Sequence, residues 1–120
     1  MKRFLLVTLI AATAVAVAVS THAVRAEAAP KKIAITAKRF AFDPGEITLK
    51  KGQPVVFVVT STDVSHGLRF RELNLDLKIP KSGTAELPFT PDKTGDFVGQ
   101  CSVFCGSGHG GMKLTLHVVE

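Results

Sequence analysis

The sequence has no tryptophan and no tyrosine, and its aromatic side chains are eight phenylalanines among 120 residues. It has only two cysteines, Cys101 and Cys105. Neither lies directly after the apolar run at the N-terminus, which argues against a lipoprotein. We find no phosphate-binding loop, no Ser-His-Asp arrangement and no carboxylate pair with positional support. Catalysis by this chain alone is therefore not expected.

A helical period is also missing after Pro30. Instead, short runs alternate apolar and polar residues, with Gly, Pro and Asp between them as turn signals. The predicted strands cover residues 31–37, 46–50, 54–60, 67–70, 73–79, 84–89, 96–101 and 112–119. Such strands cannot bury their apolar faces singly, so the pattern predicts an all-β fold, a two-sheet antiparallel sandwich.

The first residues differ from the rest of the chain. Lys2 and Arg3 precede an apolar run of 16 residues, and small residues follow it. This layout predicts a signal peptide over residues 1–26, a linker over 27–32 and a folded domain over 33–120. The alternative is an uncleaved membrane anchor, because no charge interrupts residues 4–24; without retention of this segment no transmembrane part is expected.

Charge gives little reason to expect a nucleic-acid partner. Cleavage after Ala26 removes three basic residues and no acidic ones, which leaves 12 Lys and Arg against 10 Asp and Glu. The net charge then falls from +5 to +2, without the basic stripe that nucleic-acid binding needs. An exported, periplasmic protein is expected, either free or anchored to the outer face of the inner membrane.

Residues 101–112 concentrate potential metal donors. Cys101, Cys105, His109 and Met112 fall within this loop, and four glycines between them let the backbone bend tightly. Thiolate and thioether are soft ligands that suit copper(I), while imidazole serves both oxidation states of copper. The co-occurrence of these donors predicts a copper site.

His66 is a further candidate from far upstream, since neighbouring strand ends meet in a sandwich. The set His66, Cys105, His109 and Met112 matches a single-copper site with two imidazoles, one thiolate and a weak axial Met. Cys101 is then either spare or a bridge to a second copper.

Two other outcomes are open for the same residues. A disulfide between Cys101 and Cys105 is the default for an exported pair, but it would leave the soft-donor cluster without a purpose. Zinc could take four of the donors, and Met112 would then be idle. His117 alternates with apolar neighbours on the last predicted strand and is assigned to its polar face, not to the site.

The pattern Cys-x3-Cys-x3-His-x2-Met, with Asp63-x-x-His66 upstream, resembles the copper domain of cytochrome c oxidase subunit II and of nitrous oxide reductase. That resemblance implies a cupredoxin-like Greek-key sandwich with a dinuclear CuA centre. Its implied ligands are the bridging thiolates of Cys101 and Cys105, with His66 and Met112 on one copper and His109 and the backbone carbonyl of Val103 on the other. Asp63 is weighed equally as a residue that orients a ligand and as an ordinary turn aspartate.

The chain also departs from that family. Oxidase subunits usually carry Glu at the position of Val103, where its carboxylate contributes to a magnesium site. They also take electrons from cytochrome c through an aromatic patch, which is not expected in this chain because it has no Trp and no Tyr. Phe104 is expected to shield the copper from water. These departures favour a stand-alone exported electron carrier whose partner is a c-type cytochrome or a terminal oxidase or reductase. The alternatives are a mononuclear cupredoxin and a copper-delivery protein of the cell envelope.

Overall fold

The computed structural model describes residue 16, residue 18 and residues 29–120. Most of the predicted signal peptide lies outside the described residues. Within the described part, no helix is long and apolar enough to cross a membrane. The elements are β1 (Lys31–Lys38), β2 (Ala41–Asp43), β3 (Glu46–Lys50), β4 (Val55–Ser61), β5 (His66–Phe70), η1 (Arg71–Leu73), β6 (Leu75–Ile79), β7 (Thr84–Phe89), β8 (Gly95–Gln100), η2 (His109–Gly111) and β9 (Lys113–Val119).

The strands form two facing sheets, as the alternation predicts. One sheet has the order β2-β1-β4-β7, and the other has the order β3-β9-β8-β5-β6. The predicted sandwich is confirmed, but the sheets are mixed and not purely antiparallel. β1 pairs in parallel with β4, and β3 pairs in parallel with β9, because the chain crosses between sheets before it returns beside an earlier strand.

The core lies between the two sheets and follows the period-two pattern of the sequence. In β4, Val55, Phe57 and Val59 are buried while the residues between them are partly exposed. In β9, Leu114 and Leu116 point into the same core with no exposed surface. Burial on one face of each strand fixes the register, because a slip of one residue would expose every apolar side chain.

Most predicted strands agree with the structure to within one residue at each end, and β2 and β6 differ more. The short strand β2 was not predicted, because three residues give too little alternation to recognise. The predicted strand over 73–79 begins at Leu75, after the helical turn η1. The strand β1 starts at Lys31 as the strand prediction has it, and it therefore overlaps the last two residues of the predicted linker.

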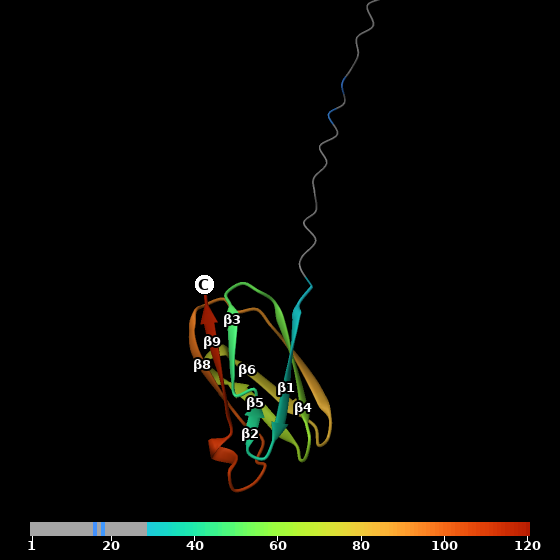
Figure 1. Ribbon diagram of the computed structural model, residues 1–120, viewed down its shortest axis with the longest axis vertical. Coiled ribbons are helices and arrows are strands. Elements are labelled where there is room, and N and C mark those ends of the chain that lie inside the picture. The colour runs from blue at the N-terminus through green and yellow to red at the C-terminus, as the bar shows by residue number, and fades with distance from the viewer. Residues whose placement is uncertain (1–15, 17, 19–28) are drawn as a thin grey trace, which may run out of the picture.

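Several chain reversals meet at one end of the sandwich. The β1–β2 turn and the loop between β8 and β9, which contains η2, lie at the end opposite the C-terminus (Figure 1). The parallel pairing of β1 with β4 brings the end of β4 to the same place. This end therefore collects loops held by both sheets.

Candidate metal centre

The donor-rich loop is fixed at both of its ends. Cys101 directly follows β8, Met112 directly precedes β9, and the backbone N–H of Cys101 donates to the carbonyl of Met112 at 3.1 Å. Cys101, Cys105 and Met112 are all buried. The antiparallel β8–β9 pair thus holds its two terminal donors side by side.

His66 reaches this loop from β5, which pairs with β8 in the same sheet. The backbone N–H of Ser102 donates to the carbonyl of Gly67 at 3.3 Å, which joins the loop to the residue after His66. A Cβ at Gly67 would lie only 2.0 Å from the Ser102 Oγ, so a larger residue there would push the loop away. His66 itself has no exposed surface.

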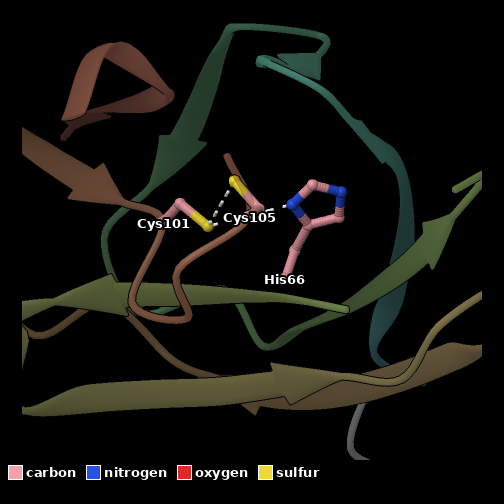
Figure 2. A group of neighbouring side chains, drawn as sticks. All are labelled: His66, Cys101 and Cys105. Carbon is pink, nitrogen blue, oxygen red and sulfur yellow. Dashed lines mark hydrogen bonds between the residues drawn. The ribbon is translucent and has the colours of Figure 1, made fainter. Parts of the chain in front are cut away.

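The structure brings His66, Cys101 and Cys105 together. The two Sγ atoms lie 3.7 Å apart, and His66 Nδ1 lies 3.8 Å from Cys101 Sγ. Figure 2 shows the three side chains pointing toward one another, and one donor atom from each lies within 4.8 Å of the others. Both cysteines are free thiols.

The other predicted donors surround the same two sulfurs. His109 Nδ1 lies 3.7 Å from Cys105 Sγ, and Met112 Sδ lies 3.9 Å from it. The Cys101 thiol donates to the carbonyl of Val103 at 3.1 Å. Each sulfur therefore has one imidazole and one weak donor beside it.

Asp63 orients His66 in this structure. His66 Nε2 donates to the Asp63 carboxylate at 2.7 Å, so that Nδ1 is the nitrogen facing the thiols. The carboxylate also accepts the backbone N–H groups of Arg39 at 2.8 Å and Val64 at 2.7 Å. The bond from Arg39, with those from His66 and Val64, outweighs desolvation and holds the pKa of Asp63 at about 2.

Arg39 and Phe40 support the loop, and sequence reasoning did not single them out. Arg39 Nε donates to the carbonyl of Cys105 at 2.8 Å. The Phe40 ring lies where a Cβ of Gly106 or Gly108 would be, at 2.9 and 2.5 Å, and Gly106 has a φ of +139°. No local pattern marks these two residues, because their contacts join segments more than sixty residues apart.

The donor set fits copper. Burial, followed by the neighbouring Cys101 thiol, raises the pKa of Cys105 to about 11, and the nearby charge of Arg39 only partly opposes this rise. Cys101 and Cys105 would hold a soft metal as thiolates, the form of cysteine that binds such metals. Two thiols, two imidazoles and a thioether in one water-poor place match copper better than a hard cation.

Phe104 lies at the surface beside the site. Its side chain is 78% exposed, and its ring lies 5.7 Å from the His109 ring between centroids. Most of the surface of Phe104 faces solvent, and its role in shielding copper from water stays a prediction.

A two-sheet β-sandwich with a buried cluster of thiols and imidazoles at one end defines the class of small copper-site proteins. The family model for the cupredoxin-like domain matches residues 8–112. The chain belongs to the cupredoxin-like family.

Individual relatives agree with the resemblance seen in the sequence. Cytochrome c oxidase subunit 2 of Thermus thermophilus is 29% identical over 86 residues, which cover 72% of this chain and 64% of that protein. The periplasmic domain of subunit II of cytochrome oxidase from Bradyrhizobium japonicum has the same fold, with a TM-score of 0.68 and 24% identity over 75% of this chain and 84% of that one. The chain thus spans less than two thirds of the length of the Thermus relative.

A third similar structure belongs to a copper exporter. The metal-binding domain of the Cu(I)-exporting P-type ATPase of Streptococcus pneumoniae, solved with Cu(I), is 26% identical with a TM-score of 0.59. The alignment covers 74% of this chain and 85% of that domain.

Proposed function

We propose that this chain is an exported copper protein that carries single electrons through a dinuclear centre of the CuA type. The observation that carries the proposal is the pair of sulfurs 3.7 Å apart, each with its own imidazole nitrogen within 3.8 Å. Two such half-sites sharing both sulfurs would hold two coppers, which supply reversible one-electron chemistry when bound.

The remaining donors complete this proposed ligand set. As in the resemblance, His66 and Met112 would belong to one copper, and His109 and the carbonyl of Val103 to the other. Cys101 and Cys105 would both serve as ligands that the two coppers share. A centre with only one copper would leave Cys101 without a ligand role, although its thiol is buried among the donors.

The protein matrix suits electron transfer because it holds the donors with little freedom. Two strand ends fix Cys101 and Met112, Asp63 fixes the ring of His66, and Arg39 fixes the carbonyl of Cys105. Donors that cannot move lose little energy to rearrangement when the charge of the centre changes. The expected partner is a c-type cytochrome or a terminal oxidase or reductase, with export to the periplasm after removal of residues 1–26.

Copper delivery is the second candidate, and the likeness to the metal-binding domain of a Cu(I)-exporting ATPase favours it. A delivery protein must release its metal to an acceptor, whereas a carrier must keep it through many redox cycles. The buried positions of His66, Cys101, Cys105 and Met112 support retention.

Electron paramagnetic resonance of the copper-loaded protein, after reduction of the thiols, tests the proposal. One electron spread over two equivalent coppers gives a hyperfine pattern with more lines than one copper nucleus can produce. This result, with two coppers per chain by metal analysis, is expected. A single-copper pattern with one copper per chain would overturn the dinuclear centre and favour delivery or a mononuclear cupredoxin.

A further inference from the structure

Two exposed aromatic rings lie at the metal end of the sandwich. Phe104 is 78% exposed and Phe40 is 38% exposed, and both contact the donor loop. Phe40 packs over Gly106 and Gly108, while Phe104 stacks at a tilt of 51° beside His109. Exposed large aromatic side chains beside a functional site are typical of the centre of a protein interface.

A hollow of about 390 Å³ opens beside Phe104 and reaches Cys105. Val64 contributes to its apolar wall, and Arg39 and Lys81 lie at its margin. None of the described residues that line it is acidic. We call Phe40, Phe104, Val64, Arg39 and Lys81 together the Phe104 face.

Arg39 and Lys81 outnumber the carboxylate of Asp63, which adjoins Val64 in the chain. Asp63 is turned inward to His66 and to two backbone N–H groups, and its side chain is 31% exposed. Lys81 lies in the turn after β6, which Ser82 holds against the Asp63 loop through its hydroxyl at 3.3 Å from the Asp63 carbonyl. The rim of the Phe104 face is therefore cationic.

We propose that the Phe104 face docks a redox protein that presents an apolar patch ringed by Asp and Glu side chains. An apolar centre with a charged rim is the usual arrangement of such interfaces, and opposite charges speed the encounter. Docking here places the partner against Phe104, whose ring contacts His109, a proposed copper ligand. This inference rests on the proposed electron-transfer function.

Stopped-flow electron transfer tests the charge of the partner. The copper-loaded protein is mixed with a reduced acidic c-type cytochrome or with a reduced basic one. We expect the acidic cytochrome to react faster at low salt, and its rate constant to fall about tenfold or more as salt rises to about 0.2 M. A faster reaction with the basic cytochrome at low salt would overturn the proposal.

Matched variants test the surface. Phe104→Ala is expected to lower the rate constant with the acidic cytochrome about tenfold, and Lys81→Glu to lower it while raising that of the basic one. The controls are Val119→Ala, an exposed residue at the end of β9, and Lys50→Glu beside it at the end of β3; neither should change the rates. Equal effects at both ends of the sandwich would overturn the assignment.

Binding is measured separately so that docking and electron transfer can fail independently. An acidic cytochrome with zinc in place of iron, which does not exchange electrons in the dark, is titrated into the copper-loaded protein. Binding that Phe104→Ala weakens, without electron transfer from the iron form, would sink the proposed function and leave the docking face standing. Concentration-dependent self-association that Phe104→Ala removes, without cytochrome binding, would assign the face to a second copy and overturn the proposal.

Discussion

Two histidine–aspartate pairs in this protein have nearly the same local geometry and different surroundings. His66 Nε2 and His117 Nδ1 each lie 2.7 Å from an aspartate oxygen, of Asp63 and Asp96 respectively. The second nitrogen of His66 faces the Cys101 sulfur at 3.8 Å, whereas that of His117 faces a Glu46 oxygen at 3.8 Å.

Burial separates the two pairs further. His66 has no exposed surface, while the side chain of His117 is 35% exposed on the outer face of the five-stranded sheet. A buried histidine between a carboxylate and two thiols is well placed to bind a soft metal. A partly exposed histidine between two carboxylates is well placed to bind a proton. The aspartate contact alone does not decide between these outcomes.

The largest expected effect comes from removing a shared sulfur. Cys101→Ser should abolish the dinuclear resonance pattern and leave at most one copper per chain, because serine is a poor ligand for copper(I). Metal analysis and electron paramagnetic resonance measure both outcomes. Retention of two coppers with an unchanged spectrum would show that Cys101 is not a bridge.

Replacing each histidine by alanine tests directly whether the two pairs differ in function. His66→Ala should lower copper affinity by more than about 100-fold, because removing a ligand costs more than removing a residue that only hydrogen-bonds to a ligand. It should also destabilise the copper-free fold by about 2–4 kcal/mol, because it leaves a cavity in place of a large buried side chain. Chelator competition and urea unfolding are the measurements.

His117→Ala is the matched control for that variant. The same truncation at the surface should leave copper affinity and the resonance spectrum unchanged, since His117 lies outside the donor cluster. Equal losses of copper in the two variants would remove the distinction between the pairs.

Replacing the aspartate should change copper affinity at only one of the two pairs. Asp63→Asn removes the carboxylate that fixes the His66 ring, and copper affinity should fall about 10–100-fold, as is usual for partners of metal-bound histidines. Asp96→Asn should leave copper affinity unchanged. Competition with a chromophoric copper(I) chelator compares them, and an unaffected Asp63→Asn protein would make Asp63 an ordinary turn residue.

The smallest effect is a pH dependence at the surface pair. The hydrogen bond to Asp96, helped by the charges of Asp96 and Glu46, raises the pKa of His117 above its usual 6.5. The protonated pair therefore stabilises the fold fully below about pH 6.5, and this contribution disappears as the pH rises through the higher folded-state pKa.

The measurement for this prediction is the urea midpoint of the wild type minus that of His117→Gln. The difference should be largest near pH 6 and vanish near pH 9, at about the values where His117 is charged and neutral. Since both proteins share His66 and all other groups, the difference isolates His117. A difference that grows with pH would contradict the raised pKa.

Much of the fold follows from local patterns. The continuous apolar run around Phe57 predicts a buried strand, the alternating run around Leu116 predicts a strand with one buried face, and the structure has a strand at both places. The mixed sheet order did not follow, because alternation shows which face of a strand is buried but not which strand lies beside it. The short strand β2 is held by pairing with β1, not by a pattern of its own.

The donor residues of the candidate site could be predicted from the sequence, but the residues that hold the donor loop in place could not. Cys105, His109 and Met112 stand out because their spacing in one loop has no structural purpose. Arg39 and Phe40 carry no such signal, since their role depends on where the β1–β2 turn lies in space. Asp63 could not be separated from a turn aspartate until its contact with His66 was seen.

The sequence by itself determined that this chain is an all-β protein with a soft-donor loop, because period-two burial and ligand chemistry are properties of the residues and their spacing. The sequence named His66 as a candidate donor and set His117 aside, but only the tertiary structure shows the contacts that hold His66 beside that loop and His117 beside Asp96. It also decided that Phe104 faces solvent beside a cationic rim. Contacts between residues distant in sequence depend on how the two sheets pack, and local spacing carries no record of that packing.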